Sequence, residues 1–136
     1  MTYALDTNIV IHYLRNEPNV REHFNKTILR GDNIVIPKIA HYEIRRGFRI
    51  QGAPNKEKLY DELIGITGYC AIAEPDGNCW ERAEQVYADL YHKRFTVGEL
   101  DILIAALCLE NDFVLVTSNV KDFENIEGLN VENWTE

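Results

Sequence analysis

Short apolar runs alternate along this chain with longer segments whose apolar residues recur at helical spacing. The runs at 3–5, 34–36, 70–73 and 113–117 predict buried strands, and a last short strand is expected at 129–132. Helices are expected at 7–14, 19–30, 39–51, 56–67, 78–94 and 99–111. This alternation predicts an α/β sandwich with a mostly parallel central sheet.

Polar residues just before the helical segments predict where several helices begin. Thr7 or Asn8 can cap the first helix, Asn19 the second, and Asp76 the long helix of the second half. The segment Thr-Val-Gly-Glu at 96–99 has the form of a capping box, in which Glu99 reaches back to the start of its own helix. Capping its own helix is therefore an alternative to a catalytic role for Glu99.

Length and composition are those of one ordinary globular domain. A chain of 136 residues can bury a single core, so one domain over residues 1–136 is expected. The apolar fraction of 46% and the charged fraction of 26% fit neither a disordered chain nor a membrane protein, and no secretory signal is visible, which favours a cytoplasmic protein. The three widely spaced cysteines, Cys70, Cys79 and Cys108, are expected to be buried thiols.

The net charge limits how this protein can act on nucleic acid. A protein that coats nucleic acid by bulk attraction needs a basic face, and a formal charge of −8 argues against that class. An enzyme escapes this argument, because acids gathered in one pocket can be neutralised by bound divalent cations. The placement of the 22 acids therefore matters more than their number.

Asp6 and Glu43 are two acids whose positions suggest chemistry. Asp6 directly follows the first strand, at the end of the sheet where ligands bind in parallel folds, although it could simply favour the dipole of the next helix. Glu43 shares a helical stripe with Ile39, Gly47 and Ile50, and this stripe is expected to face the sheet. A carboxylate there needs a metal or a partner, and a salt bridge to Arg46 is the alternative to metal.

Asp101 makes a stronger case, and Asp122 a weaker one. Asp101 interrupts a segment that is apolar almost all round, one turn into its helix, where dipole complementation is the alternative explanation. Asp122 lies after the last clear strand and is expected to be a solvated loop acid unless it joins the others. At least three acids from distant segments are thus expected at one edge of the sheet.

Such a convergence of acids predicts a metal site. Two carboxylates about 5 Å apart repel by about 3 kcal/mol at an effective dielectric constant of 20, and a divalent ion removes this penalty. Oxygen ligands without histidine or cysteine favour Mg²⁺ or Mn²⁺ over zinc. The four histidines show no ligand spacing of their own: His12, His23, His41 and His92.

Four motifs in order carry a family resemblance. They are Leu-Asp-Thr-Asn-Ile at 5–9, an acid at Glu43 after the second strand, Val-Gly-Glu-Leu-Asp-x-x-Ile-Ala-Ala at 97–106, and Val-Thr-Ser-Asn-Val-Lys-Asp-Phe at 116–123. The first three strongly resemble the PIN-domain ribonucleases. The fourth narrows the resemblance to the VapC-type toxins of prokaryotic type II toxin–antitoxin modules.

The resemblance implies a PIN-like three-layer α/β/α sandwich and a magnesium-dependent endoribonuclease, with manganese as a possible substitute. It implies Asp6 and Asp101 as metal ligands, Glu43 as the third catalytic acid, and Glu99 as a further member. RNA is hydrolysed in such enzymes by a metal-activated water, which leaves a 5′-phosphate and a 3′-hydroxyl. The resemblance also implies a homodimer and a cognate small antitoxin protein as partner.

One position departs from the family pattern. Many PIN domains carry a fourth acid just after the last buried strand, where this chain has Asn119, with Asp122 three residues on. This departure keeps open an alternative from another class, a catalytically weak PIN-fold module that binds protein or RNA. Either Asn119 or Asp122 is an accessory candidate.

Two basic runs are candidates for holding RNA phosphates. Arg45, Arg46 and Arg49 lie beside Glu43, and Lys93 with Arg94 comes just before Glu99. Solvated helix surface or pairing with the protein's own acids is the alternative for both runs. Tyr42 is a candidate for stacking on an unpaired base, whereas core packing is expected for Phe48.

Overall fold

Five parallel strands form a single sheet in the computed structural model, which describes residues 1–65 and 70–136. The strand order is β3-β2-β1-β4-β5, and every neighbouring pair is parallel. The strands are β1 (Thr2–Leu5), β2 (Asn33–Pro37), β3 (Cys70–Ala73), β4 (Val114–Val116) and β5 (Val131–Glu132). The prediction of an α/β fold with a parallel sheet is confirmed.

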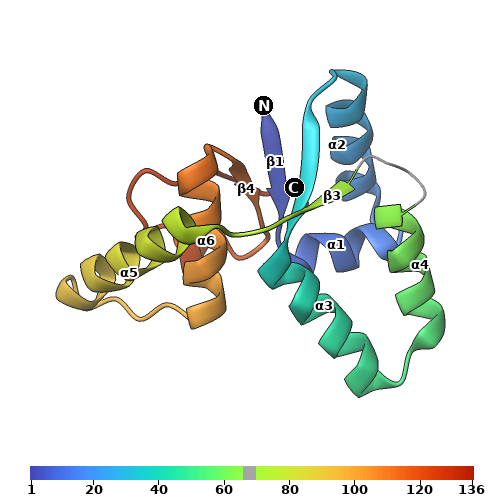
Figure 1. Cartoon of the computed structure of the whole chain (residues 1–136). Helices are drawn as coiled ribbons and strands as arrows, with labels where there is room; N and C mark the ends of the chain where they lie inside the picture. Colours follow the sequence, from blue (N-terminus) through green and yellow to red (C-terminus); the bar gives the residue numbers. More distant parts are fainter. Residues whose placement is uncertain (66–69) are drawn as a thin grey trace.

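Helices cover both faces of this sheet. Figure 1 shows α2 and α4 on one side of the strands and α5 and α6 on the other, while α3 extends from the carboxyl end of β2. The helices are α1 (Thr7–Leu14), α2 (Pro18–Leu29), α3 (Lys38–Gln51), α4 (Pro54–Gly65), α5 (Gly77–His92), α6 (Glu99–Asn111) and α7 (Val120–Phe123). The expected end of the fourth helix at Thr67 lies outside the described residues.

The strand order reverses beside β1, and this reversal positions the site. From β1 the chain moves through β2 to β3, and then it crosses back to place β4 on the other side of β1. Tyr3 is therefore in register with Ile34 on one side and with Val114 on the other. In open parallel sheets, ligands bind at the carboxyl ends of strands where the order reverses, which here means the ends of β1 and β4.

Some local predictions were wrong. Asp6, rather than Thr7 or Asn8, is the N-cap of α1, and α2 begins at Pro18, whose fixed φ suits a first helical position, rather than after a cap at Asn19. The capping box at 96–99 does not form, because Gly98 takes the N-cap position and Glu99 becomes the first residue of α6. The short helix α7 was not predicted.

Other local predictions are confirmed. Asp76 caps α5 by accepting a hydrogen bond from the Cys79 amide at 3.0 Å. The three cysteines are free and buried, and burial raises the pKa of Cys70 to about 12, which keeps its thiol protonated. Within the described ranges, none of the helices has the length and apolar character needed to span a membrane.

Candidate active site

Asp6 lies at the carboxyl end of β1, and its carboxylate is held by three donors. The Thr7 amide donates to Oδ1 at 2.8 Å, and the Thr117 hydroxyl and the Asn8 amide group donate to Oδ2 at 2.8 and 3.1 Å. The side chain is buried, at 4% exposure. Burial raises the pKa of Asp6, and the three hydrogen bonds act against this rise.

The Asp6 donors belong to a network that joins β1 to β4. Asn8 Oδ1 accepts from the Ser118 amide at 2.9 Å, and the Thr117 hydroxyl accepts from the Asn119 amide at 3.0 Å. These contacts fix the segment after β4 against the start of α1. The Asp6 carboxylate therefore has a defined position before any ligand binds.

Glu43 approaches the Asp6 network from α3. Its Oε1 accepts a hydrogen bond from the Thr7 hydroxyl at 3.2 Å. Burial raises the pKa of Glu43, the charge of Asp6 adds to the rise, and the charge of Arg46 acts weakly in the opposite direction. In the part of the chain that is described, Glu43 is thus hydrogen-bonded to Thr7 and forms no salt bridge to Arg46.

The helical stripe proposed for Glu43 needs a correction. The buried face of α3 consists of Ile39, Ala40, Ile44 and Phe48, and Ile50 is 82% exposed. Glu43 therefore stands at the border of the buried face, because helix packing against the sheet is centred one residue later than the stripe predicted. A border position leaves the carboxylate half-buried and within reach of Thr7.

Asp101 completes the cluster from the first turn of α6. Burial raises its pKa to about 6, and the charges of Asp6, Glu43 and Asp122 act in the same direction. Its Oδ2 faces Gly98, where an added Cβ would lie 3.7 Å away. Three acids, one directly after β1, one from α3 and one from α6, thus lie close enough to repel one another.

Two further acids differ in their relation to this cluster. Asp122 lies in α7, where its charge raises the pKa of both Asp6 and Asp101, so it stands near the cluster. Glu99 is exposed and lines a groove with Trp80 and Tyr87. It is not among the charges that shift the pKa of Asp101, and its catalytic role stays a prediction.

The structure also shows the contacts of Asn119 and of the two basic runs. The exposed Asn119 anchors its backbone on Thr117, as described above. Arg45 and Arg49 form ion pairs with acids of α4, and Lys93 lies 3.8 Å from Glu127. Arg94 is exposed just after α5. These contacts leave Arg46 as the arginine of the α3 run without an ion pair in the described residues.

The donor set fits a divalent cation in an open site. No group of three or more Asp, Glu, His or Cys side chains in residues 1–65 and 70–136 is already arranged to hold an ion. Magnesium does not require such a cage, since it commonly binds through one or two carboxylates and keeps several waters. The raised pKa of Asp101 and the carboxylate oxygens around it are the features that such a cation would stabilise.

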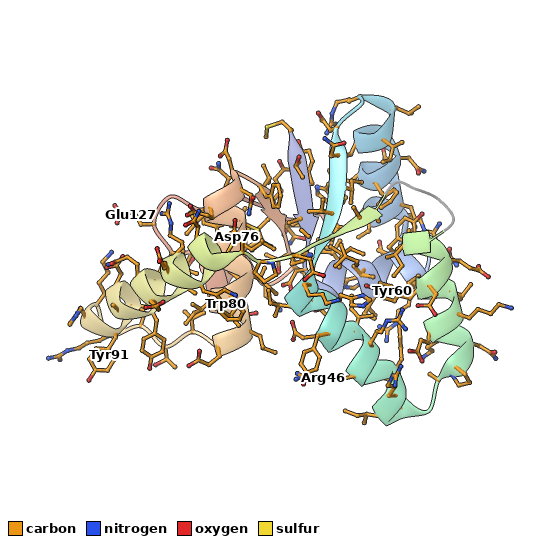
Figure 2. The ribbon with its side chains drawn as sticks, in the orientation of Figure 1. Arg46, Tyr60, Asp76, Trp80, Tyr91 and Glu127 are labelled. Carbon is orange, nitrogen blue, oxygen red and sulfur yellow. The ribbon has the colours of Figure 1, made fainter. Side chains whose placement is uncertain are left out.

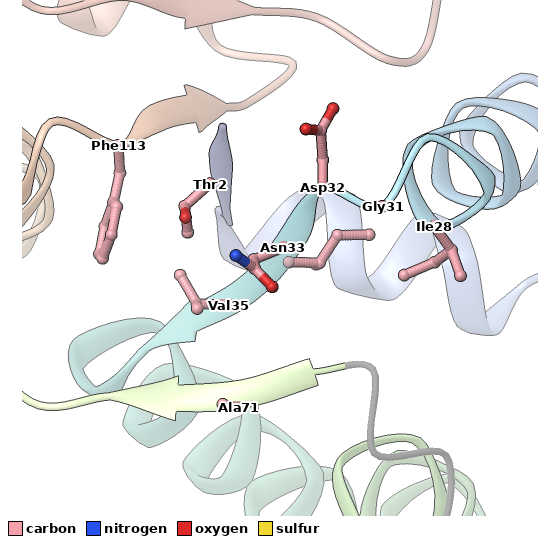
Figure 3. Close-up of a pocket in the computed structure, with 9 residues that line it drawn as sticks. Thr2, Ile28, Gly31, Asp32, Asn33, Val35, Ala71 and Phe113 are labelled. Carbon is pink, nitrogen blue, oxygen red and sulfur yellow. The ribbon is translucent and has the colours of Figure 1, made fainter.

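A cavity at the opposite end of the sheet has different chemistry. It measures about 520 Å³, and Figure 3 shows Val35, Ala71 and Phe113 along it, with Asp32 at its rim. Asp32 is already paired with Arg30 at 3.1 Å and with the N-terminal amine at 3.5 Å. The acids that could support catalysis therefore lie at the carboxyl ends of the strands, away from this cavity.

Comparison with known proteins agrees with this geometry. The family model described as PIN domain matches residues 3–129. The chain is 30% identical over 135 residues to the tRNA(fMet)-specific endonuclease VapC of Salmonella typhimurium, covering 98% of both chains. It is 27% identical over 134 residues to ribonuclease VapC2 of Rickettsia felis, again covering 98% of both.

Solved structures show the same architecture. The crystal structure of DNA-bound VapBC from Salmonella typhimurium matches with a TM-score of 0.85 and 29% identity, covering 98% of both chains. VapBC2 from Rickettsia felis, bound to a DNA fragment from its promoter, matches with a TM-score of 0.83 and 26% identity, covering 98% of this chain and 99% of that one. The chain therefore belongs to the PIN-domain family and, within it, to the VapC-type ribonucleases.

Proposed function

We propose that this protein is a magnesium-dependent endoribonuclease, the toxin of a toxin–antitoxin module, and that Asp6, Glu43 and Asp101 form its catalytic cluster. The observation that carries the proposal is the convergence of three carboxylates, from the end of β1, from α3 and from α6, whose pKa values are all raised. A cluster of this kind is costly without a cation and becomes a binding site with one. Asp6 and Asp101 are the residues that hold the ion.

The chemistry divides between the ion and the side chains. A bound divalent cation supplies charge stabilisation at the phosphoryl group and lowers the pKa of water. Asp6, kept in place by Thr7, Asn8 and Thr117, orients the site. Glu43 is suited to accept a proton from the attacking water, because its raised pKa makes it a better base than an ordinary carboxylate.

Hydrolysis fixes the products. The water oxygen forms a bond to phosphorus, the bond between phosphorus and the 3′-oxygen breaks, and the departing oxygen takes up a proton. The fragments then carry a 5′-phosphate and a 3′-hydroxyl. The ribose 2′-hydroxyl takes no part, so a 2′,3′-cyclic phosphate is not an intermediate.

The relatives suggest the cellular setting. Two are named tRNA(fMet)-specific endonuclease, which makes this tRNA the first substrate to test. Solved relatives are VapBC toxin–antitoxin assemblies, so a small antitoxin protein is proposed as the partner of this chain. A homodimer acting in the cytoplasm is proposed on the same resemblance.

The decisive experiment is cleavage of tRNA by purified, antitoxin-free protein with Mg²⁺ or with EDTA. We expect discrete fragments with Mg²⁺ alone and none from the Asp101→Asn variant. Asp112→Asn removes the same charge from the other end of α6, where Asn also tolerates the left-handed conformation, and should cleave normally. RNA binding without cleavage by well-folded wild type would contradict the proposal and favour the weak binding module that Asn119 suggests.

A further inference from the structure

RNA that approaches the acidic cluster needs a nearby positive charge to hold its phosphates, and α3 supplies one. Arg45 is engaged elsewhere, since its guanidinium lies 3.2 Å from Glu57 and 2.6 Å from Asp61. Arg49 lies 3.6 Å from the same Glu57. Arg46 forms no such pair in the described residues, and its charge acts on Glu43.

The position of Arg46 places its charge beside Glu43. It lies three residues after Glu43 on α3, and side chains at this spacing have Cβ atoms about 5 to 6 Å apart. Figure 2 shows Arg46 on the opposite side of α3 from Tyr60, the side turned toward α6. Asp101 comes from the first turn of α6, so Arg46 borders the region between two of the three catalytic acids.

Tyr42 holds the Arg46 guanidinium. The guanidinium carbon lies 5.0 Å from the centre of the Tyr42 ring, within the range of a cation–π contact. Tyr42 is 55% exposed, so part of its side chain remains open to solvent. A guanidinium and an aromatic ring held together next to a catalytic acid form a surface that matches the two components of a nucleotide, its phosphate and its base.

We propose that Arg46 and Tyr42 form a subsite for single-stranded RNA, in which Arg46 holds a phosphate next to the scissile one and Tyr42 stacks on an unpaired base. The subsite rests on the proposed nuclease function and adds the contacts that orient the substrate. It requires an unpaired segment, because a base within a duplex cannot offer its face to the ring. The enzyme therefore selects loops or single strands over continuous duplex at this position.

The test measures the affinity for a fluorescently labelled single-stranded RNA. Fluorescence anisotropy reports the binding, in Mg²⁺ and across a range of salt concentrations. All proteins carry Asp101→Asn, so that the RNA stays intact. Losing one phosphate contact to a single strand lowers the slope of log affinity against log salt by about 0.7. We expect this change for Arg46→Gln, its recovery in Arg46→Lys, a smaller change for Arg49→Gln, and none for Lys58→Gln on the exposed surface of α4.

The role of Tyr42 has a separate readout. Tyr42→Leu should weaken binding about fivefold at every salt concentration without changing the slope, since stacking is not an ionic contact. An abasic oligonucleotide of the same length should bind the parent and Tyr42→Leu proteins equally. Tyr42→Phe should behave as the parent.

Two results would overturn the subsite: an unchanged salt slope in Arg46→Gln, or equal losses in Arg46→Gln and Arg49→Gln, which would indicate a general effect of helix charge. These outcomes are distinct from failure of the nuclease function. Failure of the function appears as absence of metal-dependent cleavage by wild type, whereas failure of the subsite alone leaves that cleavage intact.

Discussion

Asp101→Asn is expected to stabilise the metal-free protein while it removes activity. Burial and the neighbouring carboxylates raise the pKa of Asp101 from 3.8 to about 6, so the folded state resists its ionisation. The difference of about 2 corresponds to about 3 kcal/mol. Because the carboxyl is partly exposed, solvent screening reduces the expected gain to about 1 kcal/mol.

The sign of the pH dependence follows from the same shift. A carboxyl whose pKa is raised by folding binds more protons in the folded state, so wild type loses stability as the pH rises from about 4 to about 6. The Asn side chain does not ionise. The advantage of Asp101→Asn should therefore be full at pH 8 and absent at pH 4.

Thermal unfolding in EDTA measures this effect, with Glu99→Gln as the matched control. Both substitutions remove one negative charge from the first turn of α6, and with it a helix-dipole interaction of about 0.3 to 1 kcal/mol. Asp101→Asn should unfold about 3 to 5 °C higher than Glu99→Gln at pH 8. Equal or lower stability of Asp101→Asn at pH 8 would refute the mutual repulsion inferred for the cluster.

Four other substitutions test the surroundings of the cluster. Thr117→Val removes a hydrogen bond that lowers the pKa of Asp6, so the acid limb of the pH–rate profile should move to higher pH; an unchanged acid limb would show that ionisation of Asp6 does not control the rate. Asp122→Asn should weaken Mg²⁺ binding several-fold in calorimetric titration and Asn119→Asp should strengthen it, while unchanged affinities would exclude both from the metal site. Arg45→Ala breaks two partly exposed ion pairs and should lower the free energy of unfolding, measured by urea titration, by about 1 kcal/mol. The affinity for RNA should change little; a large loss of affinity would indicate that Arg45 contacts RNA.

The sheet and the closeness of the three acids could be predicted from the sequence because their signals are local. Asp6 follows an apolar run directly, and Asp101 interrupts an apolar helix, so a reader of the sequence can see both without knowing the fold. The convergence of these acids followed from a general rule for parallel sheets. The position of Glu43 was less secure, because a shift of one residue in the buried face of α3 changes which side chains face the core.

The contacts that hold Asp6 could not be predicted in the same way. Thr117 and Ser118 meet Asp6 and Asn8 across more than a hundred residues, and these pairings depend on β4 lying beside β1. The sequence could not predict which arginines form ion pairs either, since Arg45, Arg46 and Arg49 look alike in sequence. The packing of α4 against α3 decides which of these arginines forms an ion pair with an acid of α4.

The central claim, that this acidic cluster directs water to a phosphodiester of RNA, is tested most directly by cleavage in ¹⁸O-labelled water with Mg²⁺. Mass spectrometry of the fragments should find one labelled oxygen on each new 5′-phosphate and a 3′-hydroxyl on the other fragment. Fragments ending in an unlabelled 2′,3′-cyclic phosphate would contradict the account, because the ribose and not water would then have been the nucleophile.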